Sequence, residues 1–155
     1  MEKLTRYCGN KTRLFVYAAL SALVTLFALS VPGSATGIMS KADLQGYWQM
    51  TIVGQTSGCG IGSTLYTFTL DANGVATNVT AVSHSQGCGD VTTTGNSFTV
   101  TSLNANGSGN ANLTCGVGCG WNLRMQVSPD RTMFNVVDVS SANPGNFIEG
   151  IAIHQ

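Results

Sequence analysis

Alternation of apolar and polar side chains, with a period of two residues, recurs from residue 46 to the end of the chain. Such alternation is typical of half-buried β-strands, whose successive side chains point to opposite faces of a sheet. It predicts eight strands, at residues 46–53, 63–71, 75–83, 96–104, 108–115, 119–127, 132–139 and 147–154. The predicted fold class is all-β: an eight-stranded antiparallel up-and-down meander that follows an N-terminal apolar signal helix.

The turns between these segments predict which residues face each other. Asn73-Gly74 is the dipeptide preferred in two-residue type I′ hairpins, and such a turn fixes the register of both strands. Phe68 is then expected to face Val79, and Tyr66 to face Ala81. Extended outward, the same register places Cys59 opposite Cys88.

Two further turns, Asn106-Gly107 and Ser128–Arg131, give two more hairpins. The pairs expected from them are Phe98 with Cys115, Val100 with Leu113, Met125 with Phe134, and Leu123 with Val136. In all three hairpins one face is apolar, and its core markers are Phe68, Phe98, Trp121 and Phe134, with Trp48 as the core marker of the first strand. A meander with one apolar face closes into a barrel or folds as a sandwich, and the regular succession of hairpins favours the barrel.

The first strand opens with Gly46-Tyr47-Trp48 and leads into the meander. In this it resembles the calycin-like barrels, the lipocalin and avidin group, over most of residues 44–154. The resemblance implies a cavity for a small ligand. Lipocalins usually add a helix and a late arginine that packs on the tryptophan; no such helix is evident here, and neither Arg124 nor Arg131 is assigned that role. A separate family of small exported β-proteins fits the same features.

The first 35 residues have the three parts of a secretory signal peptide. Four basic residues precede an uncharged apolar run from Leu14 to Val31, and small residues then lead to a cleavage site after Ala35. The alternative is a retained membrane anchor, since the run is just long enough to span a bilayer. The predicted organisation is a signal peptide (1–35), a short lead (36–45) and a disulfide-linked domain (46–155). The expected location is periplasmic or extracellular, with membrane contact only if the segment is retained.

Four cysteines remain after the signal segment, an even number as expected in an oxidising compartment. Four cysteines allow three connectivities, of which Cys59–Cys88 with Cys115–Cys119 is preferred. The latter two flank a Gly-Val-Gly loop, which lacks the C-x-x-C spacing of thiol oxidoreductases. A soft-metal site built from these cysteines and His84 is the weaker alternative, so no metal and no cofactor is predicted.

All four cysteines lie at the end of the meander that receives the longer connections, predicted at 54–62, 84–95, 116–118 and 140–146. Long loops on a rigid scaffold often carry binding surfaces. The candidate binding residues at this loop-rich end are Ile61, His84, Asp90, Asn143 and Asn146. The phase of the last strand is left open, and Glu149 faces inward if Phe147 and Ile151 do.

The composition argues against several classes of protein. Charged residues make up 9% of the chain, against roughly 25% in typical soluble domains, while 43% of the residues are hydrophobic, which does not suit disorder. Only three basic residues follow residue 35, so nucleic acid is an unexpected partner. His84, Asp90 and the neighbouring Ser83 or Ser85 lack the motif of a serine hydrolase.

The sequence therefore predicts a binding module and no enzyme. Its partner is a small apolar ligand or another exported protein, held through the loop-rich end. The alternative is an envelope interaction protein or an inhibitor of an exported enzyme, and a hydrolase is the third reading.

Overall fold

The computed structural model describes residues 37–56, 58–116, 119–140 and 146–155. The signal segment and Asn143 lie outside the described residues. Within them, no helix is both long and apolar enough to span a bilayer.

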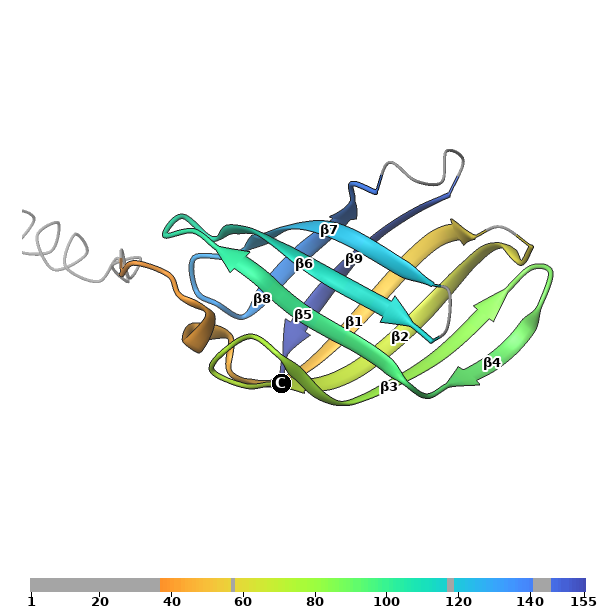
Figure 1. Cartoon of the computed structure of the whole chain (residues 1–155), viewed down its shortest axis with the longest axis horizontal. Coiled ribbons are helices and arrows are strands. Elements are labelled where there is room, and N and C mark those ends of the chain that lie inside the picture. Colours follow the sequence, from red (N-terminus) through yellow and green to blue (C-terminus); the bar gives the residue numbers. More distant parts are fainter. Residues whose placement is uncertain (1–36, 57, 117–118, 141–145) are drawn as a thin grey trace, which may run out of the picture. The chain divides into compact units, whose positions relative to one another are not determined.

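The described chain forms nine antiparallel strands, one more than predicted, in a single sheet of order β4-β3-β2-β1-β9-β8-β7-β6-β5 (Figure 1). The strands are β1 (Gly46–Thr56), β2 (Gly60–Leu70), β3 (Ala76–Ser85), β4 (Gly89–Thr93), β5 (Asn96–Leu103), β6 (Ser108–Cys115), β7 (Gly120–Val127), β8 (Met133–Asp138) and β9 (Phe147–His154). A 3₁₀ turn, η1 (Lys41–Leu44), precedes them.

The loops predicted at 54–62 and 84–95 are mostly strand. β1 and β2 extend until only the short segment around Cys59 joins them, and β4 turns back along β3. The prediction missed β4 because it is short and almost wholly exposed, so it shows no apolar alternation. The connections at this end are therefore tighter than the sequence indicated.

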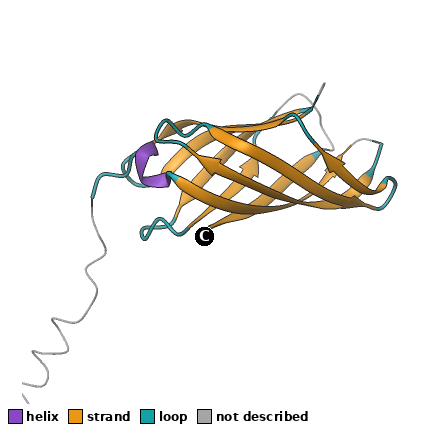
Figure 2. Ribbon diagram, turned by 90° about the horizontal axis from the view of Figure 1, so that it is seen from below, coloured by secondary structure: helices purple, strands orange, loops and turns teal. Residues whose placement is uncertain are grey.

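The sheet curls into a half-barrel, so a sandwich of two sheets is not the architecture (Figure 2). Its edge strands are β4 and β5. At the tight-turn end, an isolated bridge between Val75 and Thr99 joins the start of β3 to β5 across the opening of the curled sheet. The amide of Val100 also donates to the carbonyl of Gly74 there, at 2.8 Å. Within the described residues the sheet order shows no ladder between the two edges beyond this point.

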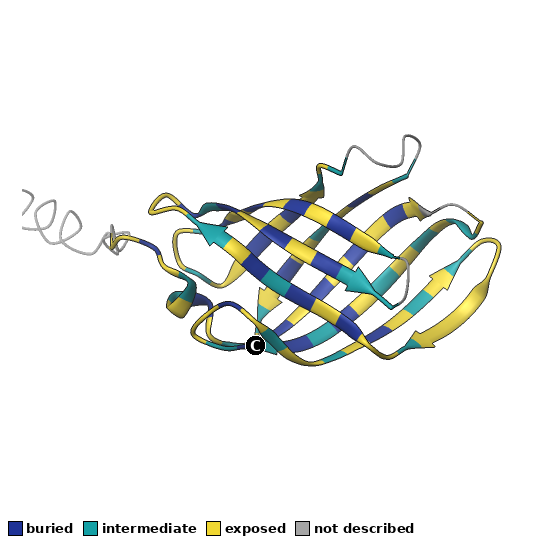
Figure 3. Cartoon of the chain, viewed as in Figure 1, coloured by how far each residue is buried: buried dark blue, intermediate teal, exposed yellow. Residues whose placement is uncertain are grey.

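Alternate residues of the strands point inward and form one apolar core (Figure 3). The five core markers predicted from the sequence are all buried. Ring pairs join strands that are not neighbours in the sheet: Phe68 lies 5.0 Å from Phe98, and Phe134 lies 5.9 Å from Phe98 and 4.8 Å from Trp48. Each such side chain contributes roughly 1.5–3 kcal/mol through burial, so these contacts hold the curled sheet together.

The η1 turn covers the tight-turn end of the core. Leu44 is fully buried, and its carbonyl accepts the indole N–H of Trp48 at 2.8 Å. The Asp43 carboxylate accepts the amide and the hydroxyl of Ser40 at 2.7 and 2.9 Å, and it lies 3.4 Å from Nε of Arg131. These contacts tie the lead segment to the β7–β8 turn and close this end.

The first hairpin differs from the prediction at its turn. Asp71–Gly74 is a wider turn, in which the Gly74 amide donates to the carbonyl of Asp71 and Gly74 has φ 77. This shifts the register by one residue, and a bulge at Asn78, with φ 55, shifts it back. Tyr66 therefore pairs with Ala81 as predicted, whereas the expected pair of Phe68 with Val79 falls in the bulge and is wrong.

The other two hairpins keep their predicted faces but not their predicted partners. Phe98 pairs with Leu113, Val100 with Ala111, Met125 with Val136, and Val127 with Phe134. Wider turns in both hairpins, and a bulge near Thr101 in the first of them, displace each register by two residues. A displacement of two leaves every side chain on the same face, because the period of a strand is two.

Candidate ligand cavity at the disulfide-bearing end

The inward-facing side chains become smaller and more polar toward the end that carries the cysteines. Along β2, Phe68 and Tyr66 are followed by Thr64 and Gly62, and β1 and β3 change in the same direction, whereas β9 has the small Gly150 before Ile148 at this end. The inner residues of these three strands near the open end are Ile52 and Gly54, Ser83 and Ser85, and Ile148 and Gly150. Small side chains cannot fill the interior of the curl, so a hollow remains there.

This hollow is a cavity of about 290 Å³ at the open end of the half-barrel. Its apolar wall includes Ile52, Leu113, Trp121 and Ile148, and its hydroxyl-bearing wall includes Thr64, Ser83, Ser85 and Thr93. The described residues that line it include His84 but no Asp, Glu, Lys or Arg. The cavity therefore offers an amphipathic surface without acidic side chains, Lys or Arg.

Tyr66 and Trp121 are the two polar-tipped aromatic residues of the cavity wall. Their exposed fractions are 6% and 9%, and neither the Tyr66 hydroxyl nor the Trp121 indole N–H donates a hydrogen bond to a described residue, although neither polar atom is itself fully buried. Burial raises the pKa of Tyr66, because desolvation disfavours the phenolate. Tyr66 is thus a neutral donor at ordinary pH values, and its hydroxyl is available to an acceptor in the cavity.

Two disulfides border the cavity. Cys59–Cys88 joins the β1–β2 connection to the β3–β4 connection, and Cys115–Cys119 spans the β6–β7 connection. Both have a Cα separation of 5.2 Å, within the usual range for a disulfide. Both pairings are those preferred from the sequence, and the first also agrees with the restored register of the β2–β3 hairpin.

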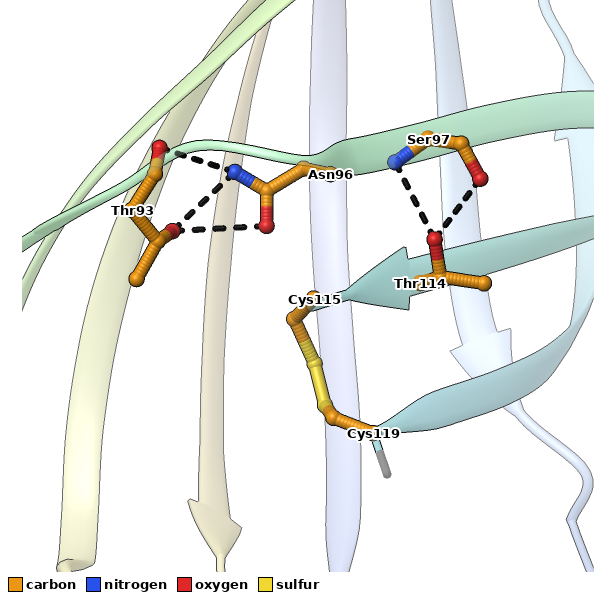
Figure 4. Close-up of a disulfide and its surroundings, with 6 residues drawn as sticks. All are labelled: Thr93, Asn96, Ser97, Thr114, Cys115 and Cys119. Atoms are coloured by element: carbon orange, nitrogen blue, oxygen red, sulfur yellow. Dashed lines mark hydrogen bonds between the residues drawn. A yellow bond between two sulfur atoms is a disulfide. The ribbon is translucent and has the colours of Figure 1, made fainter. Parts of the chain in front are cut away.

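Asn96 holds the corner between β4 and β5 beside the second disulfide (Figure 4). It is the one buried polar residue in the described part of the chain. Its amide donates to the carbonyl and to the hydroxyl of Thr93, each at 3.0 Å, and Asn96 pairs with Cys115 in the sheet. On the outer face of the same pair of strands, the hydroxyls of Ser97 and Thr114 lie 2.7 Å apart. The rim of the cavity is therefore braced by both hydrogen bonds and disulfides.

The candidate residues from the sequence lie mainly on the outer side of this end. Nδ1 of His84 lies 2.6 Å from the Asp90 carboxylate, and both side chains are largely exposed. Ile61 is 57% exposed, and Asn146 lies just before β9. Sequence reasoning missed the inner wall, although side-chain size declines along the inner faces of β1 and β2 toward this end.

The arrangement supplies only part of what a hydrolase needs. Within the described residues, His84 bonds a carboxylate and no hydroxyl, and the Ser83 hydroxyl donates to the carbonyl of Val91 at 3.2 Å. The four cysteines are paired, and no group of three His, Cys, Asp or Glu in the described chain is placed to hold a metal.

No protein-family model matches the chain, and no curated protein sequence is similar to it.

Proposed function

We propose that this protein is an exported binding module, which holds a small, neutral and largely apolar ligand in the cavity between Tyr66 and Trp121. The observation that carries the proposal is the pair of largely buried aromatic side chains, Tyr66 and Trp121, whose polar tips bond no described residue and which line one cavity. A ligand with a carbonyl, ether or heteroaromatic nitrogen would satisfy them. The two disulfides support an oxidising, exported location.

The size of the cavity narrows the ligand class. An engineered cavity of about 150 Å³ in another protein binds benzene, so about 290 Å³ suits a molecule with two fused rings. The volume lies at the low end of the usual range for ligand pockets. Long-chain lipids are therefore poorer candidates than compact bicyclic molecules.

The charge of the residues that line the cavity narrows the class of ligand further. A carboxylate or phosphate transferred into this cavity loses its hydration and finds no Lys or Arg among the described lining residues. An acidic ligand is disfavoured for this reason.

A calycin-like ancestry is a finer proposal on the same scaffold. Gly46-Tyr47-Trp48 opens β1, and Trp48 lies in the core at the closed end. His154 stacks on the indole of Trp48 at 4.8 Å, while Arg131 faces Asp43. The tryptophan thus has a stacking partner, although it is a histidine and not the arginine usual in lipocalins.

The test uses the fluorescent probe N-phenyl-1-naphthylamine with the protein as exported by its host. We expect a saturable rise in fluorescence at one site per chain. In competition, 2-acetylnaphthalene should displace the probe about 3- to 10-fold better than naphthalene, because its ketone accepts a hydrogen bond. The carboxylate 2-naphthoate should compete worst. The absence of probe binding, or the strongest competition by 2-naphthoate, contradicts the proposal.

Three variants locate the site. Tyr66→Phe should abolish the preference for the ketone while leaving naphthalene competition intact. Thr64→Phe fills the cavity and should remove probe binding. Thr92→Phe adds the same ring on the exposed outer face of β4 and should bind the probe like the parent protein.

Protein–protein interaction is the second candidate, favoured by the 57% exposure of Ile61 near the cysteine-bearing rim. The protein partner would be another exported protein. Ile61→Asp should abolish co-purification of such a partner from the exported fraction without changing probe binding; retention of the partner excludes this surface.

A further inference from the structure

A second hollow lies on the outer face of the sheet, over β7, β8, β9 and β1. It encloses about 660 Å³. Its apolar residues include Val53, Val137 and Ile151, of which Val53 and Val137 are 46% and 48% exposed. Contiguous exposed apolar surface is uncommon on soluble monomers and often marks an interface.

Arg124 and Glu149 are the two charged side chains that line this outer groove. Both are exposed, and neither forms an ion pair with a described residue. They lie in one row across the sheet, because Arg124 pairs with Val137 on one side and Glu149 pairs with Val137 on the other. Opposite charges thus flank the apolar centre of the groove, one strand away on either side.

We propose that a second copy of this chain packs on the outer groove, around a two-fold axis that runs along β8 over Val137. Such a rotation exchanges the positions of β7 and β9. Arg124 of each copy then lies opposite the partner's Glu149, and the contact occurs twice because a two-fold interface is isologous. The row is therefore complementary to itself in charge.

The same row excludes other arrangements. A two-fold axis that runs across the strands places Arg124 over the partner's Arg124 and Glu149 over the partner's Glu149, and like charges that face each other destabilise an interface. A lipid surface is a poor occupant, since Gln126 and Asn135 line the groove together with both charges.

This association is independent of the proposed ligand site. The outer groove faces away from the interior of the curl, and its lining shares no residue with the cavity. Both copies in the pair would keep the cavity mouth open.

The test is a charge swap followed by sedimentation velocity over a range of concentrations, on the protein as exported by its host. The parent protein should form a dimer that weakens as salt is added, because the ion pairs are at the surface. Arg124→Glu and Glu149→Arg should each raise the dissociation constant roughly tenfold or more, since each creates like-charge contacts. The double variant R124E/E149R should restore it.

Circular dichroism checks that each variant folds, and Thr92→Glu adds a charge on the exposed outer face of β4 as the control, which should dimerise normally. A parent protein that stays monomeric at all concentrations overturns the proposal. So does a dimer that neither single variant weakens, because that dimer uses another face. Failure of the double variant to recover would overturn the cross-pairing and with it the axis along β8.

Discussion

The indole nitrogen of Trp48 and the backbone carbonyl of Leu44 are joined by a buried hydrogen bond of 2.8 Å. This bond fastens the η1 turn to the core at the closed end of the half-barrel. His154 and Phe134 pack on the same indole, each with a ring separation of 4.8 Å.

Trp48→Phe should therefore lower the free energy of unfolding by about 2–3 kcal/mol. It leaves the Leu44 carbonyl without its donor and removes part of a fully buried ring. The neighbouring Tyr47→Phe is the control, because Tyr47 points outward and should change stability by less than about 0.5 kcal/mol. Urea unfolding measures both, and equal effects would show that the indole contact is not stabilising.

Asp43 should make stability depend on pH at the acid end. Hydrogen bonds from Ser40, and to a lesser extent the charge of Arg131, lower the pKa of Asp43 in the folded protein. A lowered folded pKa gives stability that is present above the unfolded pKa of about 3.9 and is lost as the pH falls through the folded value. Asp43→Asn should thus reduce the melting temperature at pH 6 and flatten its decline below pH 4. A decline as steep as in the parent protein would assign the acid sensitivity to other carboxylates, such as Asp71 and Asp130, whose pKa values are also lowered.

The two disulfides should contribute unequally. Cys59 and Cys88 are 29 residues apart, so the loss of their bond restores loop entropy to the unfolded chain and costs about 3.5 kcal/mol. Cys115 and Cys119 are only 4 residues apart, and their bond should contribute about 2 kcal/mol or less. The double variants C59S/C88S and C115S/C119S, compared by urea unfolding, test this order, which equal costs would contradict.

Gly74 should resist substitution for two separable reasons. Its φ of 77 is costly for any other residue, and an added Cβ would lie 2.9 Å from Cβ of Val100 across the junction of the curl. Gly95→Ala isolates the first reason, because Gly95 has φ 76 and nothing lies within 4 Å of its added Cβ. Gly95→Ala should cost about 1 kcal/mol and Gly74→Ala about 2–3 kcal/mol, as judged from thermal unfolding. Equal losses would show that the junction tolerates the methyl group.

Alternation predicted the strands and their faces because burial on one side of a sheet leaves a period of two in the sequence. It did not predict the turns. Asn-Gly occurs in several turn types, and here the carboxylate of Asp71 accepts the amides of Asn73 and Val75 at 2.9 and 2.8 Å, which favours the wider turn. The register of Cys59 and Cys88 survived only because the bulge at Asn78 offsets that turn.

The cavity was harder to predict than the strands. It arises where inner side chains are small, and a small residue such as Ser83 or Gly62 reads as polar or neutral in an alternation pattern. Tyr66 fits the alternation as an ordinary core residue, so the pattern gives no sign that it lines a cavity. The polar pair of His84 and Asp90 attracted attention in the sequence, yet the imidazole and the carboxylate meet on the outer face.

The isolated bridge between Val75 and Thr99 fastens the two sides of the half-barrel to each other at the tight-turn end only. This bridge joins the start of β3 to β5, whereas toward the disulfides the described edges of β4 and β5 are joined by no ladder. At that end the two edges are held instead by the short β4–β5 corner, where the Asn96 amide donates to Thr93, and by side-chain contacts.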